Sequence, residues 1–184
     1  PKNKGVDVAR DKWHKILARF DESAVDIRVN SFVYHAWISR NAYAGKEKLF
    51  RGIKASLSSA SAPAYLESLV SDSELYRQIL EPRDENWSKQ EGDVLASLRA
   101  LALFRVAQPL PMLLAIVRAY RSNAIALAKT KEVLRSMENF HVQFTALTAQ
   151  RTGGGTAKMY AAAAQELTAA KSPQACATAI KTFR

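Results

Sequence analysis

Apolar residues recur at the spacing of an α-helix along almost the whole sequence. Trp13, Ile16, Leu17 and Phe20 fall three and four residues apart, which places them on one face of a helix. Glycine and proline are few, with seven and six in 184 residues, which favours long regular elements. The sequence therefore predicts an all-α fold, an irregular bundle of about seven to nine helices. The expected helices after the first cover residues 24–41, 46–57, 63–80, 88–103, 111–121 and 129–150, with two short Ala-rich helices after them.

Local signals indicate where several of these helices begin and end. Pro63 suits the first position of a helix, and Ser88 with Glu91 forms the pattern of a capping box. Gly45 is expected to end the helix over 24–41. Asp72 divides two apolar groups, so we expect a break near it within residues 63–80.

The chain is expected to form a single helical domain over residues 1–184, with a sub-boundary near the Ser- and Ala-rich stretch 58–63. It begins with Pro rather than Met, and we expect a module cut from a larger multidomain protein. No apolar run reaches the roughly 18 residues that a membrane helix needs. The start lacks the apolar stretch of a signal peptide, and one cysteine excludes an internal disulfide. We expect a cytoplasmic protein that does not enter a membrane.

The charge is unevenly distributed along the chain, whose net charge is +10. Residues 58–93 contain three basic and eight acidic side chains, whereas residues 1–57 contain twelve basic and six acidic ones. Residues 94–184 contain twelve basic and only three acidic side chains. This pattern is typical either of a solvated surface or of a basic face that meets phosphate or an acidic neighbouring domain.

The residues that carry catalysis or bind metals are sparse. His14, His35 and His141 lie far apart, and neither a His-Glu-x-x-His motif nor a Gly-x-Ser-x-Gly elbow is present. Cys176 lies in an Ala-rich stretch typical of a small buried residue. The residues alone therefore indicate no catalytic centre and no metal site, and they imply no cofactor in this chain. Whether the chain is an enzyme stays open.

Two basic segments are candidates for binding phosphate. Four cations project from one short helix that contains a single acidic residue, Glu47. Gly153 to Gly155 precede a helix whose first N–H groups would lie beside two further cations. A solvated helix face and a flexible turn are the simpler interpretations of the two segments. The candidate nucleic-acid contacts are Arg40, Lys46, Lys48, Arg51, Lys54, Arg151 and Lys158.

Residues 32–40, 48–54, 110–115 and 138–151 together resemble the helical region of GmrSD-type proteins, which are related to type IV, modification-dependent restriction systems of bacteria. The resemblance covers nearly the whole chain and consists of packing patterns. Family members carry a ParB-like nucleotide-using domain with an Asp-Gly-Gln-Gln-Arg motif, and often an HNH-type nuclease domain. This sequence has neither, so no catalytic residue of the family can be placed on it.

The resemblance implies a non-catalytic helical module of a DNA-restriction or phage-defence protein. Its expected partners are the flanking domains of the parent protein and DNA, which it would contact along the backbone. Nucleotide and divalent metal would be bound by the other domains. Two alternatives stay open: an interdomain scaffold that does not bind DNA, and a small-molecule-binding or enzymatic helical domain with a pocket between its helices.

Overall fold

The computed structural model describes residues 2–148 and 154–183 and confirms the all-α fold. Every regular element within these ranges is helical. The helices are α1 (Lys2–Asp21), α2 (Val29–Ile38), η1 (Lys46–Lys48), α3 (Leu49–Ser56), α4 (Ala62–Leu80), η2 (Asp84–Asn86), η3 (Lys89–Glu91), α5 (Gly92–Leu103), α6 (Leu110–Arg121), α7 (Leu127–Thr148), α8 (Gly154–Ala169) and α9 (Pro173–Phe183), where η denotes a 3-10 helix.

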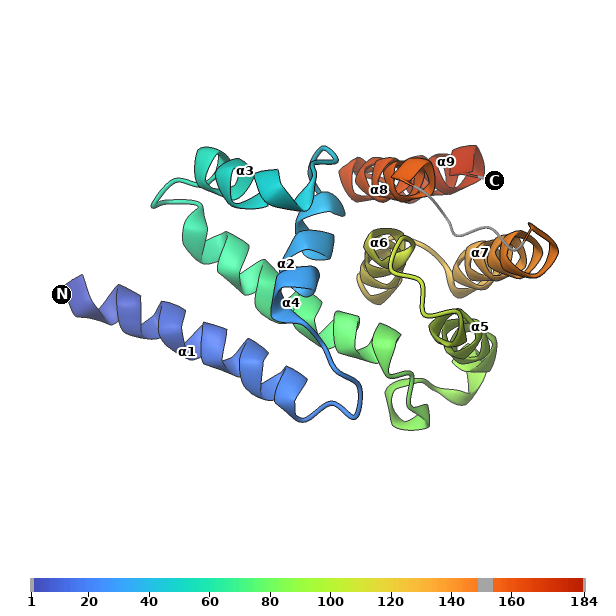
Figure 1. The fold of residues 1–184 in the computed structure, drawn as a ribbon, viewed down its shortest axis with the longest axis horizontal. Coiled ribbons are helices and arrows are strands. Elements are labelled where there is room, and N and C mark those ends of the chain that lie inside the picture. The colour runs from blue at the N-terminus through green and yellow to red at the C-terminus, as the bar shows by residue number, and fades with distance from the viewer. Residues whose placement is uncertain (1, 149–153, 184) are drawn as a thin grey trace.

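Helix α6 lies at the centre of the bundle and packs against α2, α4, α7 and α8. Helices α1 and α4 run side by side on one flank, and α5 packs against α7 on the other (Figure 1). Nearly every side chain of α6 is buried, including Met112, Leu114 and Ile116. One continuous apolar core extends from Ile16 to Ile180, so helices on both sides of residues 58–63 share it. None of the described helices is long and apolar enough to cross a membrane.

Several helix boundaries agree with the local signals in the sequence. Pro63 lies in the first turn of α4, where its missing N–H leaves no helical hydrogen bond unmade. The capping box is formed, and the carboxylate of Glu91 accepts a hydrogen bond from the N–H of Ser88 at 2.6 Å. The box opens the short η3, which leads directly into α5.

The helix expected over 24–41 is shorter, and the expected role of Gly45 is wrong. Ile27 is buried in the segment before α2, Arg28 has an extended backbone, and α2 begins at Val29. At the other end, the side-chain amide of Asn41 donates a hydrogen bond to the carbonyl oxygen of Trp37 at 3.0 Å and caps the helix. Gly45 precedes η1 with a φ of −64° and ends no helix.

The break expected near Asp72 is also absent, because α4 is continuous through this residue. Asp72 is 1% exposed and accepts hydrogen bonds from two arginines, Arg40 in the turn after α2 and Arg118 of α6. Arg118 reaches its two oxygens at 3.0 and 3.1 Å, and Arg40 Nη2 lies 3.0 Å from Oδ1. A carboxylate satisfied in this way can occupy a helix interior without interrupting the helix.

The same buried centre extends to α8. Arg118 also donates to the hydroxyl oxygens of Ser39 and Thr168, at 3.0 and 3.3 Å. The Thr168 hydroxyl donates in turn to the carbonyl oxygen of Ser39 at 2.9 Å. Burial lowers the pKa of Arg118, while the adjacent Asp72 carboxylate acts in the opposite direction. Four helices, α2, α4, α6 and α8, therefore meet at one hydrogen-bonded group of charges.

Part of the uneven charge of the sequence is compensated by pairing within the molecule. Acidic side chains of residues 58–93 form ion pairs with basic ones in both flanking segments. These pairs are Glu67 with Lys12, Glu74 with Arg19, Asp72 with Arg40 and Arg118, Glu91 with Arg121, and Asp93 with Lys131.

Removing the carboxylate of Asp72 should destabilise the fold far more than removing a comparable exposed one. We expect Asp72→Ala to reduce the free energy of unfolding by about 3 kcal/mol or more, because it leaves two arginines without their shared partner. Asp84→Ala is the matched control, since Asp84 accepts from Arg99 at 2.7 Å but is exposed, and its loss should stay under about 1 kcal/mol. Urea unfolding of both variants checks this, and equal losses would contradict it.

Candidate functional site

The exposed cations of η1 and α3 form a basic surface. Lys48 lies in η1, and Arg51 and Lys54 follow in α3 at steps of three residues. Residues three apart lie close together on a helix surface, so the three side chains form one strip along α3. All three are exposed, and none has an ion pair in the described part of the chain.

Helix α3 is attached to the body of the protein by its opposite, apolar side. Leu49 and Ile53 pack on a small second cluster around Trp37, yet no side chain of α3 is fully buried. Phe50 is 77% exposed and projects beside the cations. A groove of about 500 Å³ lies between α1, α2 and α3, lined by Trp13, Val33 and Phe50 among others. The basic strip therefore has an exposed aromatic ring and an apolar groove next to it.

Two tyrosines bring together cations that lie far apart in the sequence. Lys46 Nζ is 5.5 Å from the ring centroid of Tyr34, and Lys158 Nζ of α8 is 6.0 Å from that of Tyr43. The Tyr34 hydroxyl donates to the carbonyl oxygen of Ala44 at 3.0 Å, and burial followed by the hydrogen bond with Tyr43 raises the pKa of Tyr34. Lysines held over aromatic faces are attracted by the ring electrons but keep their charge available to an anion.

A pocket of about 220 Å³ lies at this tyrosine pair. Its lining includes Tyr34, Tyr43, Lys46 and Ala157, the last in the first turn of α8. His35 also lines it, and His35 Nδ1 lies 2.7 Å from the hydroxyl of Tyr76 in the core. Burial, and then the charge of Lys46, lower the pKa of His35 to about 4, so the ring is neutral at pH 7. The pocket is thus a basic, aromatic cleft at the junction of α2, η1 and α8.

The nearest acidic group does not neutralise this region. The carboxylate of Glu47 folds back over Gly45, at the place that a Cβ atom on residue 45 would occupy. The negative charge of Glu47 contributes to the raised pKa of Tyr34. The Glu47 carboxylate therefore lies near the tyrosines rather than beside the cations of α3. The positive potential over Lys48, Arg51 and Lys54 is therefore left largely uncompensated.

The seven predicted contacts fall into four groups. Lys48, Arg51 and Lys54 form the exposed strip of α3, while Lys46 and Lys158 meet at the tyrosine pair. Arg40 is separated from them, because its guanidinium is mostly buried and bonded to Asp72. Arg151 and Gly153 lie outside the described residues.

The other candidates of the sequence occupy ordinary structural positions. Cys176 is buried, as its Ala-rich surroundings predict. His141 is fully buried, its Nε2 lies 3.0 Å from the Tyr160 hydroxyl, and burial lowers its pKa. No group of three or more His, Cys, Asp or Glu side chains in the described ranges is placed to hold a metal ion.

The residues missed by sequence reasoning are Tyr34, Tyr43 and Phe50. The two tyrosines flank the first basic segment, and this nearness of aromatic and basic residues is the signal that was present in the sequence. That Lys158 joins them depends on where α8 begins in space, which no local pattern reveals.

No family model matches this chain, and neither a curated protein nor a solved structure matches it.

The low pKa of His35 and the part that Lys46 plays in it are testable by NMR. A pH titration of the His35 ring should give a pKa of about 4. Lys46→Gln should raise that pKa, because the repelling charge is removed, whereas Lys48→Gln removes the same charge further along η1 and should change it less. Equal shifts in the two variants would show that Lys46 has no special proximity to His35.

Between pH 7 and pH 5 His35 should also affect stability. A folded pKa of about 4 against an unfolded value near 6.5 means that only the unfolded chain binds the proton in this window. The neutral His35 ring therefore makes its full contribution to stability above the pKa of the unfolded chain. As the pH falls below that value, the free energy of unfolding decreases, by roughly 2 kcal/mol at pH 5. His35→Gln should remove this part of the pH dependence in urea unfolding, and an unchanged dependence would contradict the assignment.

Proposed function

We propose that this chain is a non-catalytic helical module that binds the phosphate backbone of DNA through η1 and α3. In this proposal it belongs to a cytoplasmic restriction or phage-defence protein of the kind that the resemblance to GmrSD-type proteins implies. It connects a nucleotide-using domain with a nuclease domain, and the nucleotide and divalent metal are bound by those domains.

The observation that carries the proposal is the contrast in charge pairing. Many of the basic side chains of α1, α6 and α7, and Arg40 in the turn after α2, are paired with a carboxylate of the same chain. Lys46, Lys48, Arg51 and Lys54 are not, although a strongly acidic segment lies nearby in the same molecule. A surface that keeps four such cations close together on one exposed edge is suited to a polyanion.

The geometry favours backbone contact rather than reading of bases. Lysine and arginine side chains spaced along one short helix match phosphates spaced along a strand, and such contacts carry no sequence information. The exposed ring of Phe50 offers a further contact to a sugar or an unstacked base. Binding is therefore expected to be tolerant of sequence and sensitive to salt.

A second function is favoured by the apolar groove beside the strip. Leu49, Phe50 and Ile53 present apolar surface that the described residues cover only in part. An amphipathic, acidic segment of a flanking domain would fit an apolar groove bordered by lysines. This is the interdomain scaffold without DNA binding, and it requires the same cations.

Fluorescence anisotropy with a short labelled duplex distinguishes the two functions. We expect micromolar binding at low salt that weakens with a slope of roughly −3 in a plot of log K against log salt, for three to four phosphates. Lys48→Glu with Arg51→Glu should weaken binding about tenfold or more and make the slope less steep by about 2, because two phosphate contacts are lost.

The control is Lys171→Glu with Lys181→Glu, which reverses two exposed cations at the other end of the molecule. Both double variants carry the same net charge. A purely non-local electrostatic effect would therefore weaken DNA binding equally in both, and that result would contradict the assignment of the DNA contact to α3. A folded wild-type chain that does not bind duplex DNA at low salt would reject DNA binding and leave the interdomain scaffold.

A further inference from the structure

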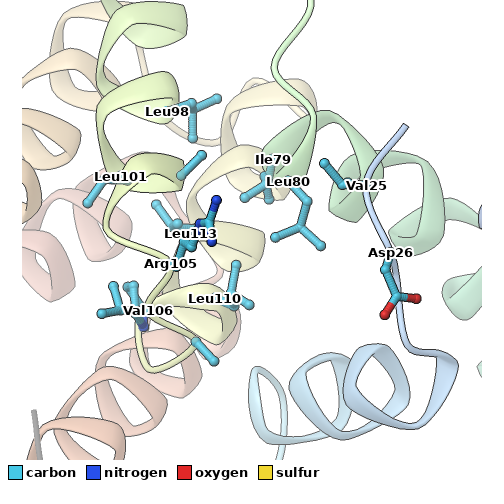
Figure 2. A pocket seen from close by; sticks show the side chains of 13 residues that line it. Val25, Asp26, Ile79, Leu80, Leu98, Leu101, Arg105, Val106, Leu110 and Leu113 are labelled. Carbon is cyan, nitrogen blue, oxygen red and sulfur yellow. The ribbon is translucent and has the colours of Figure 1, made fainter. Parts of the chain in front are cut away.

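A further, apolar pocket has a volume of about 300 Å³. It is formed where the ends of α4 and α5 meet the start of α6 and the segment before α2. Its walls are apolar side chains such as Ile79, Leu80, Leu101 and Leu113 (Figure 2). This size is at the lower end for small-molecule sites, which are mostly apolar with a few placed polar groups.

One cation belongs to this lining. Figure 2 shows Arg105 among the apolar side chains, between the leucines of α5 and the Ile79–Leu80 end of α4. Its guanidinium has no hydrogen-bond or ion-pair partner in the described part of the chain. Arg51, Arg105 and Arg135 are exposed and have no carboxylate partner among the described residues, and of these three Arg105 lines this apolar pocket.

The backbone of Arg105 is also unusual. Its φ of 50° is in the left-handed region, which side chains other than glycine, asparagine and aspartate rarely adopt. The other described residue with positive φ is Asn123, whose side chain suits that conformation. Arg105 directly follows the C-cap of α5, a position where a left-handed residue commonly ends a helix and where glycine is preferred, so the arginine is present at a conformational cost.

We propose that this pocket binds a small apolar monocarboxylate, whose chain fills the leucine-lined space and whose carboxylate pairs with Arg105. A guanidinium matches a carboxylate with two parallel hydrogen bonds, and this is the strongest neutral-pH partner for an unpaired arginine. The acidic residue of the lining, Asp26, has Arg28 3.6 Å from its carboxylate and lies at the segment before α2. A pocket whose lining has one cation, Arg105, and one acidic residue, Asp26, suits a monoanion better than a phosphate dianion.

Octanoate is the probe, compared with octanol and octylammonium, which have the same chain and a different head. Isothermal calorimetry should show saturable binding of octanoate, weaker binding of octanol and none of octylammonium. Arg105→Gln should weaken octanoate binding about tenfold or more, the effect of losing charge-assisted hydrogen bonds, and leave octanol unchanged. Arg135→Gln on α7 is the control, because it removes the same charge from an exposed residue outside the pocket.

The location is checked by methyl NMR, in which octanoate should shift the signals of Leu101 and Leu113. Ala102→Phe, which places a ring in the pocket, should abolish binding of octanoate and octanol alike. The proposal is overturned if octanoate fails to bind at millimolar concentration, if octylammonium binds equally well, or if the Arg105 and Arg135 variants bind octanoate with equal affinity. These results do not depend on DNA binding by α3.

Discussion

The buried carboxylate of Asp72 is the interaction on which the arrangement of the helices depends. It lies in the middle of α4 and receives hydrogen bonds from Arg40 in the turn after α2 and from Arg118 of α6, and Arg118 continues the network to Thr168 of α8. Desolvating three charges is costly, so the network stabilises the fold only while every member is present. It therefore fixes the relative position of four helices more strictly than apolar packing alone, because leucine and alanine surfaces tolerate small shifts that a shared carboxylate does not.

That arrangement determines which cations remain available. Acidic residues of α4 and of the segment up to Asp93 lie against basic side chains of α1, α6 and α7 and against Arg40 in the turn after α2. Helix α3 is attached at the edge of the molecule and does not reach these acids (Figure 1). Its lysines and arginine keep an uncompensated charge, and Lys46 joins Lys158 at the tyrosine pair beside the start of α8. The basic surface is thus a consequence of how the acidic part of the chain is used elsewhere.

The sequence was sufficient to predict the helices but not the partnerships between them. Apolar spacing identifies a helix because burying one face requires it, and the capping box of Ser88 and Glu91 acts locally, so both were predictable. Arg40 and Lys48 look alike in the sequence, because both are basic residues near the first basic segment. Arg40 is mostly buried against Asp72 whereas Lys48 is exposed, and this difference depends on which helices meet in space. For the same reason Asp72 suggested a break in α4, when its charge is in fact satisfied by two residues far along the chain.

Amide NMR of the labelled protein titrated with a short DNA duplex tests most directly whether the unpaired cations of η1 and α3 are the binding surface. We expect the chemical-shift changes to concentrate in residues 46–56 and near Lys158, to disappear at high salt, and to spare Asp72, Arg118 and α9. Changes of similar size along all helices, or changes centred on other exposed cations such as Lys171 and Lys181, would contradict it.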